Sequence, residues 1–181
     1  MKATGIVRRI DDLGRVVIPK EIRKTLRIRE GEPLEIFTDR EGEVILKKYS
    51  PVGEMGTLSR QYSESLAQTL GCTVCITDRD QVIAAAGVGK KALEEQNITP
   101  GTEGVIQKRE QLLAERGSRK YQTVVSEDLG YSEEIISPII SAGDAIGSVI
   151  LLQKEEQKHF GPAEKKVAES AAGFLGKQME Q

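Results

Sequence analysis

The chain has 181 residues, 38% of them hydrophobic and 30% charged, which is the composition of a folded globular protein and not of a disordered or fibrous one. The apolar run at residues 145–152 is far shorter than the roughly 20 residues of a membrane helix, and two cysteines are too few for a disulfide framework. We therefore expect an intracellular, cytoplasmic protein with no membrane partner.

Charge is unevenly distributed along the chain. Overall, 26 Lys and Arg face 28 Asp and Glu, a formal net charge of −2. Residues 1–29 nevertheless carry nine basic and three acidic side chains, a local net charge of +6, and six of the nine are arginines. Guanidinium groups suit phosphate oxygens and guanine edges, so this segment favours a polyanion such as DNA. Charge alone leaves an ordinary solvated surface as the alternative.

The first 48 residues predict four short strands and one small helix. The predicted strands are residues 5–10, 15–18, 34–38 and a strand that begins at residues 44–46. The first two flank DDLG, which supplies turn residues, and Pro19 suits the first position of a helix with Ile22 and Leu26 on one side. A unit of this size buries too little surface to be stable alone, so we expect it to dimerise.

A proline and two glycines at residues 49–56 indicate a domain boundary, and we predict domains at residues 1–52 and 56–181. Residues 50–181 carry 14 basic and 19 acidic side chains, a net charge of −5. Leu58, Tyr62, Leu66 and Leu70 form one apolar helical stripe that Gly71 ends. SAGD at residues 141–144 is a strong hairpin signal.

The remaining elements of this half predict a mixed sheet flanked by helices. Strands are predicted at residues 72–77, 82–86, 122–125, 135–140 and 145–153, and helices at residues 90–96, 101–115 and from Gly161 and Pro162 onward. Apolar side chains recur along one face of the last helix. That face and the Leu58 stripe could pack either on their own sheet or in an intermolecular four-helix bundle.

The stretch GIVRRIDDLGRVVIPKEIRKTLRIREGEPLEIF, residues 5–37, resembles the N-terminal domain of the AbrB-type bacterial transition-state regulators. The resemblance implies a swapped-hairpin β-barrel formed by a dimer, which agrees with the size argument above. It also implies that basic side chains at the positions of Arg8, Arg15, Arg23 and Lys24 bind double-stranded DNA. Lys24 departs from an arginine often found in the family, so a point-charge phosphate contact replaces a bidentate one. Arg9 is not assigned, because adjacent strand residues point to opposite faces.

The order of elements in residues 56–181 resembles a GAF domain, so the fold class expected for the whole chain is α+β, a dimeric barrel plus a GAF-like mixed α/β domain. Both halves in this order resemble developmental transcription regulators of spore-forming bacteria. That resemblance implies an activator and repressor of sporulation-stage genes, associated with the nucleoid, and a tetramer formed through the helices of the GAF-like domain. It also implies a small-molecule ligand that the sequence does not identify.

Other candidate sites in the second half have simpler explanations. Cys72 and Cys75 form a CxxC pair, but on a strand they fall on opposite faces and behave as small buried residues. Asp78 and Asp80 are typical of a hairpin turn, and His159 of a loop. The segment NITPGTEG, residues 97–104, could hold an anion at a helix start or could be an ordinary loop.

We therefore predict no catalytic residue, no metal site and no cofactor, and DNA binding as the function. Two alternatives from other classes are kept. One is a thiol-dependent GAF-fold redox enzyme that uses Cys72 and Cys75. The other is an antitoxin, because related swapped-hairpin domains neutralise toxins. Antitoxins carry a flexible tail, whereas this C-terminal half has strong hairpin and helix signals.

Overall fold

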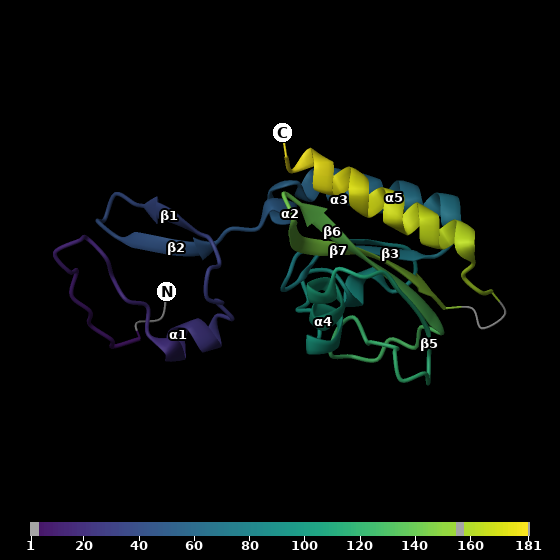
Figure 1. Cartoon of the computed structure of the whole chain (residues 1–181), viewed down its shortest axis with the longest axis horizontal. Coiled ribbons are helices and arrows are strands. Elements are labelled where there is room, and N and C mark those ends of the chain that lie inside the picture. Colours follow the sequence, from purple (N-terminus) through teal and green to yellow (C-terminus); the bar gives the residue numbers. More distant parts are fainter. Residues whose placement is uncertain (1–3, 155–157, 181) are drawn as a thin grey trace. The chain divides into compact units, whose positions relative to one another are not determined.

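The computed structural model describes residues 4–154 and 158–180. The chain divides into two compact units, Met1–Tyr49 and Ser50–Gln181, which are called here the N-terminal unit and the C-terminal unit (Figure 1). Within the described ranges, no helix combines the length and the apolar character that a membrane crossing needs.

The N-terminal unit contains one helix and one hairpin. Helix α1 (Lys20–Thr25) follows Pro19, and strands β1 (Leu34–Thr38) and β2 (Val44–Lys48) pair in antiparallel fashion, as predicted. The turn between them is closed by Asp39, whose Oδ1 accepts hydrogen bonds from the backbone N–H groups of Glu41 and Glu43, each at 2.9 Å.

The two strands predicted at residues 5–10 and 15–18 are not formed, and that prediction is wrong for the single chain. Residues 4–19 form an irregular segment, called here the excursion, with one turn at residues 12–14 (Figure 1). The β-branched residues there favour extended backbone, but a strand exists only when a neighbour pairs with its N–H and C=O groups. In the described residues, the N–H of Asp11 bonds the carbonyl of Arg15 at 3.0 Å, but no strand pairs with either segment.

The C-terminal unit is built on a five-stranded sheet with the order β4-β3-β7-β6-β5, in which every neighbouring pair is antiparallel. The strands are β3 (Thr73–Thr77), β4 (Val82–Ala86), β5 (Leu112–Glu115), β6 (Glu133–Ser141) and β7 (Asp144–Gln153). The expectation of a mixed sheet was therefore wrong. The hairpin predicted at SAGD is confirmed, with Ala142 and Gly143 at positive φ between β6 and β7.

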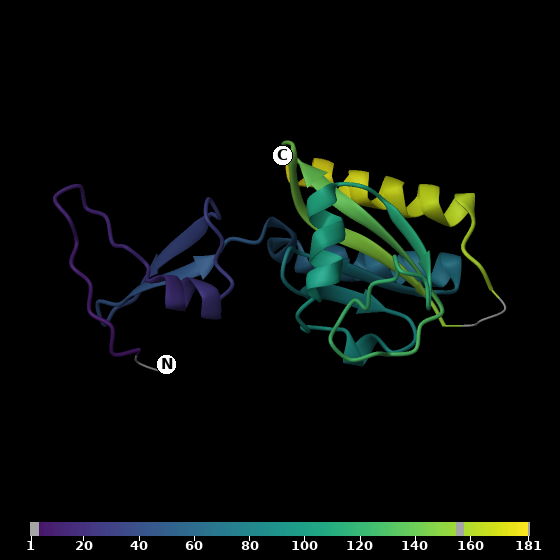
Figure 2. The same ribbon diagram turned by 60° about the horizontal axis from the view of Figure 1, so that its bottom comes forward.

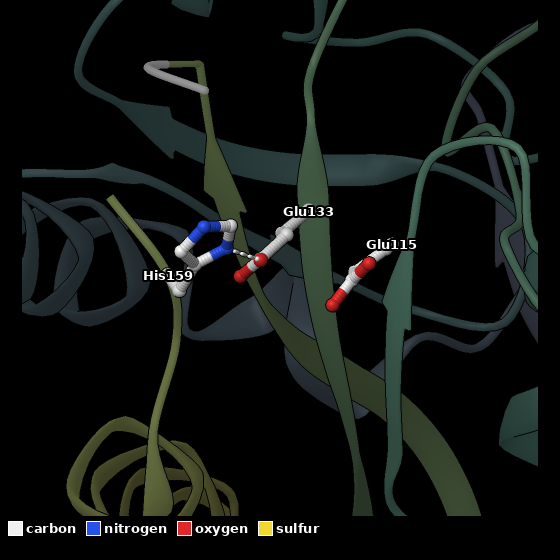
Figure 3. A group of neighbouring side chains, drawn as sticks. All are labelled: Glu115, Glu133 and His159. Carbon is white, nitrogen blue, oxygen red and sulfur yellow. Dashed lines mark hydrogen bonds and ion pairs between the residues drawn. The ribbon is translucent and has the colours of Figure 1, made fainter. Parts of the chain in front are cut away.

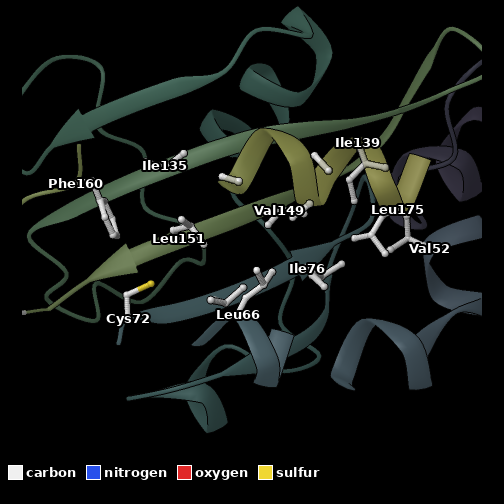
Figure 4. Packing of buried hydrophobic residues seen from close by; sticks show 14 residues of the cluster. Val52, Leu66, Cys72, Ile76, Ile135, Ile139, Val149, Leu151, Phe160 and Leu175 are labelled. Carbon is white, nitrogen blue, oxygen red and sulfur yellow. The ribbon is translucent and has the colours of Figure 1, made fainter. Parts of the chain in front are cut away.

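Helices cover both faces of this sheet. The short α2 (Pro51–Glu54) leads into α3 (Gly56–Leu70), which ends at Gly71 with φ 65° as the sequence predicts, and α5 (Pro162–Gln178) packs beside it (Figure 1). Figure 2 shows α4 (Pro100–Lys108) on the opposite face. The face under α3 and α5 carries the larger core, which includes Ile76, Leu151 and Leu175 (Figure 4).

Three element predictions in this unit were wrong for tertiary reasons. The helix predicted over residues 101–115 ends at Lys108, because Arg109 adopts φ 59°, and residues 112–115 form β5 beside β6. Residues 122–125 make only an isolated bridge, between Ile98 and Val125, and the helix at residues 90–96 is reduced to the 3₁₀ turn Lys90–Ala92. Pairing with a neighbouring strand outweighs local propensity at the first of these sites.

Candidate nucleic-acid interface

The four basic residues predicted to bind DNA all lie in the N-terminal unit, outside its hairpin. Arg8 is exposed in the irregular excursion, Arg15 follows its turn, and Arg23 and Lys24 form the last turn of α1. The sequence of α1 therefore brings the last two together, whereas Arg8 and Arg15 come from segments that lack a β partner.

A single acidic residue organises the turn before Arg15. The Oδ1 of Asp11 accepts hydrogen bonds from the backbone N–H of Leu13 (3.0 Å) and of Arg15 (2.8 Å), and its Oδ2 accepts one from Nε of Arg15 (2.9 Å). The N–H and guanidinium of Arg15 hold the pKa of Asp11 below its usual value. The side chain of Arg15 remains 69% exposed, so the turn orients a guanidinium that solvent can still reach.

The helix α1 carries the other pair of basic residues. Lys24 is exposed, whereas Arg23 is half-buried, and its Nε makes no hydrogen bond within the described part of the chain. A buried donor without an acceptor is costly. Within the described residues, the Nε of Arg23 is therefore left for an acceptor that this chain does not supply.

The N-terminal unit has almost no core of its own. Among residues 4–49, Pro19 alone is buried, and large apolar side chains such as Val7 (85% exposed), Val17 (72%) and Ile36 (66%) face solvent. A hollow of about 360 Å³ opens between the excursion, α1 and β2. Arg8 is the one charged residue that lines it. The others are apolar: Ile6, Val16, Val17, Ile18, Pro19, Ile22, Leu26, Ile28 and Leu46.

The cysteines of the C-terminal unit lie on opposite faces of the sheet, as predicted. Cys72 packs with the core under α3 and α5, and Cys75 with the core under α4. Burial raises the pKa of Cys72 to about 11 and raises that of Cys75 further. The thiolate form that a redox enzyme needs is therefore disfavoured at both positions.

The start of α4, considered above as an anion site, is occupied by the protein itself. The Oγ1 of Thr99 accepts a hydrogen bond from the N–H of Thr102 at 3.3 Å, and the hydroxyls of both residues donate to the carbonyl of Thr123. A side chain at Gly101 would collide with Oε1 of Gln122. The segment is a capped helix start packed against a loop.

The loop beside the sheet face under α4 encloses a small hollow. The hollow between Leu93, Tyr121 and Tyr131 measures about 10 Å³, which is the size of one water molecule. The loop that closes it is fastened by Glu134, whose Oε1 accepts a hydrogen bond from the N–H of Gln122 at 2.6 Å. Burial raises the pKa of Glu134 to about 8, so its carboxyl group is largely neutral near pH 7.

The turn residues behave as predicted, and a further cluster was missed. Oδ1 of Asp78 accepts from the N–H groups of Asp80 and Gln81, each at 2.7 Å, which closes the β3–β4 turn. His159 lies in the loop before α5, but it contacts Glu133, with Glu115 close by. These three residues are too far apart in the sequence to form a recognisable motif.

Comparison with known proteins assigns both units. Residues 54–180 match the family model "Stage V sporulation protein T C-terminal, transcription factor", and residues 7–54 match "Antidote-toxin recognition MazE, bacterial antitoxin". The chain is 51% identical to stage V sporulation protein T of Bacillus subtilis over the full length of both proteins. It is also 63% identical to the transition state regulatory protein AbrB of B. subtilis over 51 residues, which are 28% of this chain and 52% of AbrB.

Solved structures support the fold of the C-terminal unit. The GAF domain of the Acinetobacter phosphoenolpyruvate-protein phosphotransferase superimposes with a TM-score of 0.58 over 74% of this chain and 84% of that domain. At 13% identity this likeness shows the fold alone. The AbrB-like segment, the GAF fold and the full-length identity agree, and the chain belongs to the stage V sporulation protein T family of transcription factors.

Proposed function

We propose that this protein, a transcription factor that regulates sporulation genes, binds duplex DNA through a head formed by the N-terminal units of two chains and both activates and represses its targets. The observation that carries the proposal is that the most basic part of the chain coincides with the part that has no core. Membership of a transcription-factor family, not an enzyme family, supports the same conclusion.

Dimerisation supplies what the single N-terminal unit lacks. A second chain inserted into the hollow of about 360 Å³ would cover Val17, Ile22 and Leu26 and give the excursion a β partner. Each Å² of apolar surface removed from water stabilises the assembly by about 25 cal/mol. Exchange of the segments predicted as strands would complete a barrel around both chains.

Within this dimer, Arg8, Arg15, Arg23 and Lys24 form the proposed DNA-contacting set. Arg8 lines the hollow, so a partner strand that fills it would also order this side chain. Arg15 is presented by the Asp11 turn, and Arg23 has an Nε that needs an acceptor. The proposed mechanism is a sheet and loop platform that presses these groups against phosphates and groove edges, with much specificity arising from DNA shape.

The C-terminal unit is proposed to join two such dimers into a tetramer. Phe174 on α5 is 41% exposed and contacts Tyr62 of α3, with ring centroids 5.3 Å apart, so aromatic surface from both helices reaches the outside. Two copies of this helix pair could pack as a four-helix bundle. A small-molecule ligand remains a prediction. To enter the hollow of about 10 Å³, a metabolite must displace the loop that Glu134 fastens.

The test is the salt dependence of DNA binding. Fluorescence anisotropy with a labelled duplex from a sporulation promoter would be measured across a salt series for the parent chain, Arg15→Ala and Arg23→Ala. Each lost phosphate contact should weaken binding and reduce the slope of log K against log salt by about one. Arg40→Ala is the matched control, because Arg40 is an exposed arginine of the same unit that lies in the β1–β2 turn.

The outcomes separate the two parts of the proposal. A slope unchanged in Arg15→Ala and Arg23→Ala, or reduced equally in Arg40→Ala, would overturn the assignment of these residues. Ultracentrifugation of a fragment of residues 1–52 addresses the head. A fragment that sediments as a monomer and does not bind DNA even at low salt would contradict the proposed dimeric head.

The antitoxin alternative has one observation in its favour, the family match at residues 7–54. That match covers only the N-terminal segment. The C-terminal unit is an ordered sheet with a core on each face, which is unlike a flexible tail that wraps a toxin. We therefore propose that the shared segment serves DNA binding in this chain.

A further inference from the structure

Three ionisable side chains from separate parts of the C-terminal unit converge at one edge of its sheet (Figure 3). Glu115 ends β5, Glu133 begins β6, and His159 lies in the loop that leads into α5. One ligand atom from each residue lies within 4.8 Å of the other two. The cluster belongs to the C-terminal unit, whereas the basic residues assigned to DNA binding belong to the N-terminal unit.

Glu133 is the fixed member of this cluster. Its residue surface is only 3% exposed, and its Oε2 accepts a hydrogen bond from the backbone N–H of Phe160 at 2.7 Å. Its Oε1 contacts Nδ1 of His159 (Figure 3). A buried carboxylate is costly unless it is paired or coordinates a metal, so this site is built around a group that requires a positive partner.

Glu115 adds a second carboxylate that the fold would otherwise disfavour. It is the direct partner of Glu133 in the antiparallel register of β5 and β6. Side chains of directly opposed residues point to the same face of a sheet, and like charges in that position are destabilising. Both carboxylates lie beside the imidazole of His159, and Oε1 of Glu133 contacts its Nδ1. The arrangement thus concentrates negative charge around one imidazole nitrogen.

We propose a binding site for Zn²⁺ or a similar divalent transition-metal ion, formed by Glu115, Glu133 and His159. One imidazole nitrogen and two carboxylate oxygens are a ligand set that such ions accept, with water completing the shell. Ligand atoms about 2.1 Å from a tetrahedral ion lie roughly 3.4 Å from each other. Nδ1 of His159 must therefore move slightly away from Glu133 to admit the ion. His159 can do so, because its side chain is 68% exposed on a loop.

The position of the site indicates what the metal would do. It would tie the edge strand β5 to β6 and to the residue before Phe160, whose ring packs in the core that includes Leu175 of α5 (Figure 4). Metal binding would therefore secure the N-terminal entry of α5, the helix proposed above to join dimers. The expected effect is on stability and assembly and not on the DNA contacts themselves.

The test uses the full-length, untagged chain, in which His159 is the only histidine. Zinc chloride is added at pH 7.5 while the two imidazole nitrogens are followed by long-range ¹H–¹⁵N correlation spectra, and binding is measured by isothermal titration calorimetry. We expect one ion per chain, a shift confined mainly to Nδ1, and a raised thermal midpoint, because the ion binds the folded state.

Variants separate this site from adventitious binding. Glu115→Gln and His159→Gln should each weaken zinc binding by roughly tenfold or more. Loss of an outer-shell partner of a metal ligand lowers affinity by about that factor, and loss of the ligand itself should lower it at least as much. Both positions are exposed, so neither change should unfold the chain. Glu43→Gln is the control, because Glu43 belongs to the other carboxylate cluster, with Asp39 and Glu41, in the N-terminal unit. It should leave zinc binding and the spectra unchanged.

Two results would overturn the proposal. One is zinc binding that is unaffected by Glu115→Gln and His159→Gln, or that is lost in Glu43→Gln. The other is an imidazole signal that responds to pH but not to zinc, which would show that a proton and not a metal holds His159 against Glu133.

Discussion

Two glycines of α5, three residues apart, should respond in opposite ways to the same substitution. A Cβ added at Gly176 would lie 2.1 Å from the carbonyl oxygen of Ile140 in β6, whereas one added at Gly173 would meet nothing within 4 Å. Relieving the first contact requires the end of α5 to move by roughly 1 Å, against a densely packed core. Leu175, which is fully buried, would move with it.

The magnitudes follow from these two environments. Overpacking costs about 1–3 kcal/mol, whereas replacing Gly by Ala in a helix gains about 0.8–1 kcal/mol. Gly173→Ala should therefore stabilise the C-terminal unit by up to about 1 kcal/mol. In Gly176→Ala the same gain offsets part of the overpacking, so this change should destabilise the unit by about 0–2 kcal/mol. The two variants should differ by the overpacking cost of about 1–3 kcal/mol, so at about 3 °C per kcal/mol their thermal midpoints should differ by roughly 3–9 °C.

The measurement is differential scanning calorimetry of both variants and the parent at one chain concentration, since assembly also shifts the midpoint. Sedimentation velocity on the same samples would show that the oligomeric state is unchanged. Equal shifts in the two variants, or a stabilised Gly176→Ala, would refute the close approach of α5 to the backbone of β6.

Two further predictions rest on the titration of single groups. Cys72 and Cys75 should resist iodoacetamide at pH 7.5 in the folded chain, because burial raises the pKa of both thiols, and mass spectrometry that found rapid alkylation would revive the thiol-enzyme alternative. Asp11→Asn should speed amide exchange at Arg15 at neutral pH. Because the pKa of Asp11 is lowered, its ion pair with Arg15 is present above pH 3.8 and is lost as the pH falls through the pKa of the folded state. The exchange rates of the parent and the variant should therefore converge in acid. A difference in rate that does not change with pH would contradict this.

Local sequence signals predicted those helices and turns of the C-terminal unit whose boundaries are set by the backbone itself. The Leu58 stripe predicts the helix α3. Gly71 and the SAGD turn each specify an element boundary through backbone chemistry that tertiary contacts do not override. The strand β5 was missed because its residues continue a helical pattern, and only the positive φ of Arg109 and pairing with β6 decide otherwise.

The same miss explains why the cluster of Glu115, Glu133 and His159 could not be predicted. With residue 115 assigned to a helix, nothing places it opposite Glu133, and His159 reaches them only through the loop before α5. In the N-terminal unit the limit is different. The basic residues and the two segments with strand propensity are evident from the sequence. In the proposed head, the conformation of these segments depends on a second molecule that no local pattern contains.

In the proposed dimer, the near-absence of buried residues in each N-terminal unit would also link the amount of folded head to protein abundance. If the head folds only when two chains meet, the amount of competent head at low expression rises with the square of the chain concentration, so a doubling of synthesis yields roughly four times as much. A regulator built in this way would yield little folded head at low basal synthesis, and the yield would rise faster than the synthesis itself.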